Sequence, residues 1–112
     1  MASMSVTPAR ARELALELPG AVAAPHFDRT AFRTPRKIFA TLAGDGSDIN
    51  LMLDPDLQAL YCSQEPEIFA PVPNAWGRNG ATRCDLAAAD EAALKSALRA
   101  AHALAAPRRR AR

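Results

Sequence analysis

The sequence predicts an α+β protein in which helices from both ends of the chain pack on one face of an antiparallel sheet. Three observations carry this prediction. Apolar residues recur at helical spacing near both ends, they alternate with a period of two between residues 30 and 53, and short turn-forming segments separate the alternating stretches. Short connections favour antiparallel pairing, and helices segregated from an antiparallel sheet define the α+β class.

The first helix is predicted over residues 8–18. Thr7 followed by Pro8 is typical of a helix N-terminus, because the hydroxyl can accept a hydrogen bond from a free amide and proline lacks an N–H that would go unused there. Pro19 and Gly20 then end the helical pattern.

A meander of three strands is predicted next. Phe32 lies on the first strand, and the segments "TPR" and "AGDGSD" supply the two turns. Strict alternation implies one buried face and one accessible face. The apolar set expected beneath the helices is Ile38, Ala40, Leu42, Ile49, Leu51 and Leu53.

The second half of the chain predicts a short helix over residues 55–63, a late strand over residues 81–86 and a final helix from Asp90 to Pro107. The segment between the short helix and the late strand, "EPEIFAPVPNAWGRNG", is predicted to be a loop because it is rich in Pro, Gly and Asn.

Composition indicates a single domain over residues 1–107, followed by a basic disordered tail over residues 108–112. About half of the 112 residues are apolar, and no apolar run approaches the roughly 20 residues that cross a bilayer. The N-terminus has no hydrophobic signal region, so we expect a cytoplasmic monomer with reduced thiols at Cys62 and Cys84.

The net charge of +2 comes from the tail. Four arginines lie in the last six residues, "PRRRAR", and without them 10 cations face 12 anions, a net charge of −2. A domain that clamps nucleic acid over its whole surface is usually basic throughout. The charge therefore favours a local basic surface over a general one.

The accessible face of the meander is the first candidate site. By alternation, Lys37, Phe39 and Met52 share that face, Arg83 joins them from the late strand, and Arg33 and Arg36 lie at its rim. Cations pair with phosphates, and an exposed aromatic ring stacks on a base. The competing interpretation is that Phe39 and Met52 cover a second small layer beneath the Pro-rich segment, with the charges solvating its border.

The segment "NAWGRNG" is the second candidate. Trp76 and Arg78 present an indole and a guanidinium on one loop. The competing interpretation, which the residues favour, is that Trp76 anchors the loop by burying its large ring, with the indole only partly covered.

No catalytic or metal site is expected. The sequence has no G-x-S-x-G, P-loop or dinucleotide-binding motif, and the pair Asp54 and Asp56 is explained by helix capping. The soft ligands are scattered singly at His26, Cys62, Cys84 and His102, which is unlike a zinc site. We therefore predict neither an enzyme nor a cofactor.

Several segments, taken in order, resemble the MmcQ/YjbR family of small bacterial proteins. They are "LPGA", "HF", "AFR", "KIFATL", "LMLDPDLQALY", "FAPVPNAWGRNGATRCDL" and "LKSALRAAHALAAP", and the similarity covers residues 9–107. The sequence departs from the family at Pro35 and Arg36, where many members have two glycines, at Ala81, where many have an aromatic residue, and at His102, where an aromatic is common.

The resemblance implies a fold like that of CyaY and frataxin, and it implies DNA binding. It does not extend to iron handling, because Arg10 and Arg12 interrupt the acidic residues of the first helix. We therefore expect DNA binding through the open sheet face. The alternative is a protein-interaction module or a small-ligand binder that uses an apolar patch around Phe39, Met52 and Trp76. The DNA-binding residues expected are Arg33, Arg36, Lys37, Phe39, Trp76, Arg78 and Arg83.

Overall fold

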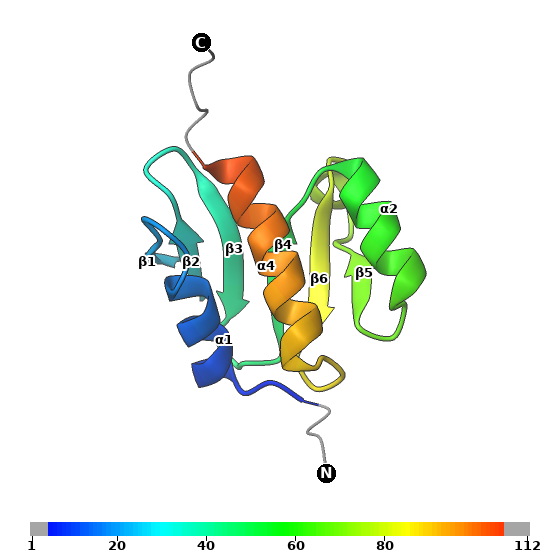
Figure 1. Cartoon of the computed structure of the whole chain (residues 1–112), viewed down its shortest axis with the longest axis horizontal. Helices are drawn as coiled ribbons and strands as arrows, with labels where there is room; N and C mark the ends of the chain where they lie inside the picture. Colours follow the sequence, from blue (N-terminus) through cyan, green and yellow to red (C-terminus); the bar gives the residue numbers. More distant parts are fainter. Residues whose placement is uncertain (1–4, 107–112) are drawn as a thin grey trace.

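A computed structural model describes residues 5–106 and shows an α+β architecture (Figure 1). Its six strands form one sheet with the spatial order β1–β2–β3–β4–β6–β5, and all neighbours are antiparallel. The basic tail expected over residues 108–112 lies outside the described residues. The elements are α1 (Pro8–Leu16), β1 (Val22–His26), β2 (Arg29–Arg33), β3 (Ile38–Ala43), β4 (Asp48–Met52), α2 (Pro55–Gln64), β5 (Phe69–Pro71), α3 (Ala75–Arg78), β6 (Ala81–Asp85) and α4 (Glu91–Ala105).

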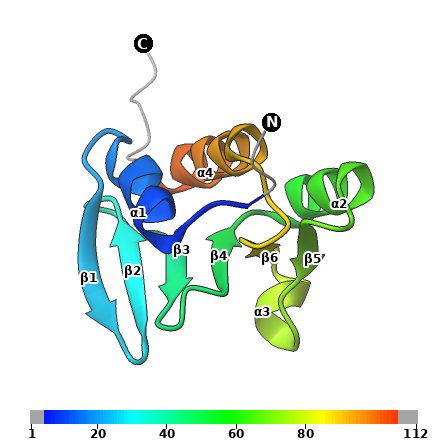
Figure 2. The ribbon, with the colours of Figure 1, turned by 90° about the horizontal axis from the view of Figure 1, so that it is seen from below.

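The two terminal helices, α1 and α4, lie on the same face of the sheet, as predicted. α4 contacts β3 and β4, and α1 contacts α4 and β3. Figure 2 shows α2 on this side as well, whereas the single turn of α3 lies on the opposite side. The face of β3 and β4 that points away from α4 is therefore left without a covering helix.

Local capping chemistry sets the starts of the three longer helices. The side chains of Thr7, Asp54 and Asp90 each accept a hydrogen bond from the backbone N–H three residues later, at 3.1, 2.8 and 2.7 Å. α1 ends at Leu16, two residues earlier than predicted. Within residues 5–106, no helix combines the length and the apolarity needed to cross a bilayer.

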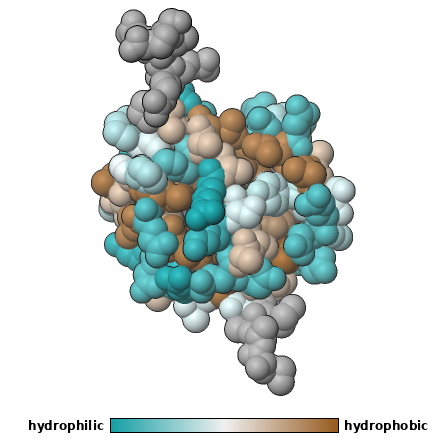
Figure 3. All heavy atoms as spheres, viewed as in Figure 1, coloured by the Kyte–Doolittle hydropathy of each residue, from teal (hydrophilic) through white to brown (hydrophobic). Residues whose placement is uncertain are grey.

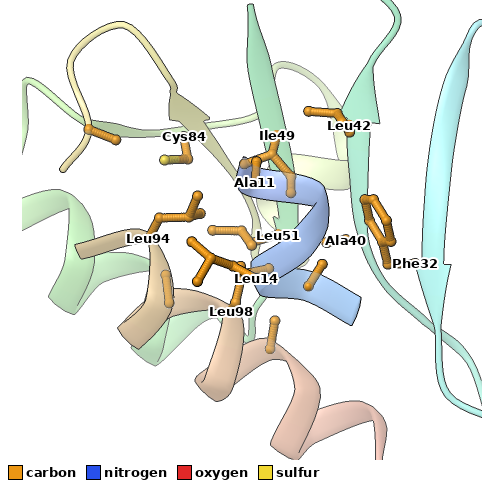
Figure 4. Close-up of a cluster of buried hydrophobic side chains, with 14 of the residues drawn as sticks. Ala11, Leu14, Phe32, Ala40, Leu42, Ile49, Leu51, Cys84, Leu94 and Leu98 are labelled. Carbon is orange, nitrogen blue, oxygen red and sulfur yellow. The ribbon is translucent and has the colours of Figure 1, made fainter. Parts of the chain in front are cut away.

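The core lies between these helices and the sheet (Figure 4). Leu14 of α1 and Leu94 and Leu98 of α4 point toward Ile49 and Leu51 of β4, and all five are buried. Small side chains let the helices approach the sheet closely, so that few voids remain. The buried alanines of the two helices are Ala11, Ala15, Ala97, Ala101 and Ala105.

Neither edge strand of the sheet was predicted from the sequence. β1 and β5 occupy the two edges of the sheet, and each contains a proline, at Pro25 and Pro71. Proline cannot donate to a ladder, so it is confined to edges and bulges, and its presence made both segments resemble connections. The β1–β2 hairpin consequently widens the accessible face beyond what the meander alone provides.

The alternation predicted for β3 is wrong at its first two residues. The register shifts between Phe32 and Arg33, which pair with Ala40 and Ile38, so Phe39 has no partner on β2. Phe39 is fully buried beside His102 of α4, with ring centroids 5.3 Å apart. Ile38 lies instead on the accessible face, because one extra residue in a strand reverses the side-chain alternation.

The burial of Cys84 makes the stability of the fold depend on pH. The thiol is fully buried on β6, and desolvation, followed by the nearby Asp85 carboxylate, raises the pKa of Cys84 to about 12. The unfolded chain releases this proton near pH 9 and the folded chain does not, so folding loses stability as the pH rises from 9 to 12.

We expect Cys84 to make the wild type lose about 1 kcal/mol more stability between pH 8 and pH 10 than Cys84→Ala does. Urea denaturation of both proteins at the two pH values measures this difference. The comparison cancels the tyrosine and lysine titrations that the two proteins share. Equal losses would show that the thiol ionises alike in the folded and unfolded chains.

Candidate nucleic-acid interface

The uncovered face of the sheet is hollowed into a groove of about 720 Å³. Its floor is formed by Ile38 and Thr41 of β3 and by Asn50 and Met52 of β4. The β1–β2 turn and α3 lie on either side of these two strands (Figure 2). The opposite, helix-covered face mixes hydrophilic and hydrophobic residues over α1 and α4 (Figure 3).

Basic side chains are concentrated at this groove. Four of the residues that line it are basic, Arg29, Arg33, Arg36 and Lys37, whereas one is acidic, Asp28. This local excess contrasts with the net charge of −2 outside the last six residues. The fold therefore gathers positive charge on one face of an otherwise slightly acidic chain.

Arg33 and Lys37 are the groove cations that are available to a ligand. Arg33 ends β2, where its Nε donates to the Thr34 carbonyl at 3.2 Å. Lys37 is exposed in the β2–β3 connection and has no ion-pair partner within residues 5–106. Both were predicted as site residues, and the structure places both at the groove.

Arg36 lines the groove but has a structural role. Its guanidinium donates to the carbonyl oxygens of Leu104, Ala105 and Ala106 at the end of α4. These carbonyls lack partners within the helix and carry the negative end of its dipole, so a cation there stabilises the helix end. The Thr34 hydroxyl donates to the same Ala105 carbonyl at 2.7 Å.

Arg83 is held in an ion pair on the accessible face. Asp48 bridges two arginines, with Oδ1 2.7 Å from Arg29 and Oδ2 3.0 Å from Arg83. Arg29 also donates to the hydroxyl and the carbonyl of Thr41, at 2.9 and 2.7 Å. Arg83 is thus largely neutralised by Asp48, and it does not line the groove.

Trp76 lies on α3 and is 67% exposed, so the residue is only partly covered, as expected, and most of it stays accessible. Asn74 begins this turn with a φ of +75°, and its side chain accepts a hydrogen bond from the Trp76 N–H at 3.0 Å. Gly77 is buried against the backbone of Val72, and Gln58 of α2 donates to the Gly77 carbonyl at 2.8 Å. A packed backbone therefore presents an exposed ring to the groove.

Phe27 faces the groove from the β1–β2 turn and is 95% exposed. Phe27 was not predicted as a site residue, because the β1–β2 hairpin that carries it was not predicted. Its backbone has a φ of +60°, a region that side chains other than Gly, Asn and Asp rarely adopt. The rings of His26 and Phe27 meet edge to face, with centroids 5.0 Å apart.

Two other predicted site residues do not line the groove. Phe39 is buried beneath α4, as described above, and is removed from the candidate site. Arg78 is exposed on α3 but outside the groove lining. Within residues 5–106, no three His, Cys, Asp or Glu side chains are gathered so that they could hold a metal ion.

The protein is of the α+β class. Its terminal helices lie on one face of the sheet, and the other face carries a groove lined by basic and aromatic residues. Comparison with known families then identifies it, since a model of the YjbR family matches residues 16–104. The chain therefore belongs to the YjbR family. No curated protein matches the sequence.

A solved structure supports the same fold. It is the crystal structure of Deinococcus radiodurans protein DR2400, which contains a DUF419 domain. The similarity has a TM-score of 0.71 at 19% sequence identity and covers 88% of this chain and 76% of that chain. At this identity the likeness extends to the fold alone.

Proposed function

We propose that this YjbR-family protein binds DNA through the groove on the open face of the sheet. The observation that carries the proposal is that Arg33 and Lys37 line the groove without an ion-pair partner within residues 5–106, on a chain body of net charge −2. Phosphate contacts supply most of the affinity in such complexes. The exposed Phe27 and Trp76 add surfaces for base contacts.

The structure changes the set of residues that we propose contact DNA. Arg33 and Lys37 contact phosphates, and Phe27 and Trp76 contact bases. Arg36 and Arg83 support the site indirectly, through the end of α4 and through Asp48. In this role the protein binds DNA without catalysing a reaction or using a cofactor.

The competing proposal is that the groove binds a protein or a small ligand through its apolar lining. Phe39 is buried and cannot belong to such a patch, but Met52 and Trp76 do line the groove. Apolar contact is almost insensitive to salt, whereas DNA binding weakens steeply as salt rises. Salt dependence therefore separates the two proposals.

Removing one groove cation is expected to weaken DNA binding and its salt dependence together. In Lys37→Gln or Arg33→Gln, the slope of log affinity against log salt concentration should become shallower by about 1, because one fewer counterion is released. Fluorescence anisotropy of a labelled 20-base-pair duplex and a single strand, titrated at several salt concentrations, measures the slope.

The matched control is Arg12→Gln, which removes an exposed arginine from α1 on the other side of the molecule. It should leave the slope unchanged. A second control is the chain that ends at Ala106 and so lacks the basic tail. If only the full chain binds, or if Arg12→Gln and Lys37→Gln weaken binding equally, the groove is not the DNA site.

A further inference from the structure

We infer that the groove takes single-stranded DNA in preference to duplex, with unpaired bases stacked on the rings of Phe27 and Trp76. This inference rests on the proposed function and adds the form of DNA and a binding residue, Phe27. Three features of the structure lead to it: the conformation of Phe27, the support of Trp76 and the placement of both beside the groove cations.

Phe27 does not stabilise the fold at its position in the β1–β2 turn. A large apolar side chain that is 95% exposed gains almost nothing from burial, and a φ of +60° strains any residue that has a Cβ. Glycine would fit this turn between β1 and β2 without strain. An exposed ring in a strained turn is therefore explained by contact with a ligand rather than by stability.

Trp76 is exposed but held in place. The Asn74 cap, the contact of Gly77 with the Val72 backbone and the hydrogen bond from Gln58 all restrain the backbone on either side of it. Its indole also borders a smaller hollow that it shares with Lys37. Trp76 and Lys37 therefore line the same hollow, where the ring can stack on a base and the ammonium can pair with a phosphate.

The exposed rings of Phe27 and Trp76 at the groove favour a strand whose bases are free. Bases in a duplex are stacked on one another and paired, so their faces are closed to aromatic side chains unless the duplex is kinked or opened. Bases in a single strand expose both faces, and stacking on aromatic rings is tolerant of sequence. A hollow with an aromatic ring at either side and cations along its edge matches the single strand.

Trp76 is the only tryptophan in the chain, so its fluorescence reports on the groove directly. The experiment titrates the full chain with three probes: a 10-nucleotide oligothymidylate, an abasic strand of equal length and a 10-base-pair duplex. We expect the oligothymidylate to quench Trp76 and to bind about tenfold more tightly than the abasic strand, which has the same phosphates and no bases. The duplex should bind more weakly than the oligothymidylate and leave Trp76 unquenched.

Phe27→Gly tests the second ring without endangering the fold, since glycine suits the positive φ. It should weaken oligothymidylate binding about tenfold, leave the abasic strand unaffected and not lower the melting temperature. The inference is overturned if duplex and single strand bind equally, or if Phe27→Gly leaves oligothymidylate binding unchanged. These results differ from failure of the proposed function, in which no DNA binds in a manner that depends on Lys37.

Discussion

Truncation of Phe39 to alanine is expected to lower the free energy of unfolding by about 3–5 kcal/mol. Phe39 is fully buried beneath α4, where its ring meets His102 edge to face at 5.3 Å. Removing it leaves a cavity that the surrounding helix and strand fill only partly. Urea denaturation followed by circular dichroism measures the loss.

The same chemical change at Phe27 is the matched control. Phe27→Ala removes an exposed ring, so it should alter the free energy of unfolding by no more than about 0.5 kcal/mol. If Phe39→Ala is too unstable to study, Phe39→Leu keeps most of the apolar volume and should lower the free energy of unfolding by a smaller amount. A loss below about 1 kcal/mol for Phe39→Ala would contradict the register shift in β3 and return Phe39 to the accessible face.

Replacement of Gly77 by alanine is expected to cost about 2–4 kcal/mol and to displace α3. A methyl group built on Gly77 overlaps the carbonyl of Val72, and backbone atoms cannot move aside as the end of a flexible side chain can. Because Trp76 lies on the same turn, oligothymidylate binding should fall as well. Denaturation and the emission spectrum of Trp76 measure the two consequences.

Gly20→Ala distinguishes this overlap from ordinary backbone strain. Gly20 has a φ of +73°, but a methyl group there meets its nearest neighbour, Pro35 Cδ, at an ordinary 3.7 Å. The variant should therefore cost about 1–2 kcal/mol and leave Trp76 emission unaltered. If Gly77→Ala proved as mild as Gly20→Ala, α3 would not be held by the Val72 contact.

The starts of the three longer helices and the strand β4 were predictable because their causes are local. A cap requires only a Ser, Thr, Asp or Asn followed within three residues by a free amide, and Thr7, Asp54 and Asp90 each act in this way. The alternation in β4 is regular and unbroken, so Ile49 and Leu51 are buried as predicted.

The candidate site was only partly predictable, because distant parts of the chain decide it. Arg36 is a cation next to a turn in the sequence, and its partners on α4 lie about 70 residues away. Arg83 resembled a free cation until the sheet order placed Asp48 beside it, 35 residues earlier in the chain.

The sequence by itself determined the α+β class, the starts of the three longer helices and most of the buried set, since periodicity and capping act over a few residues. Only the tertiary structure decided which side chains face the groove. One extra residue in β3 turns Phe39 toward the core and Ile38 toward the groove. The edge strand β1, which contains Pro25 and was not predicted, leads into the turn that places Phe27 at the groove. Both outcomes depend on contacts between segments far apart in the chain, and such contacts leave no periodic trace in the sequence.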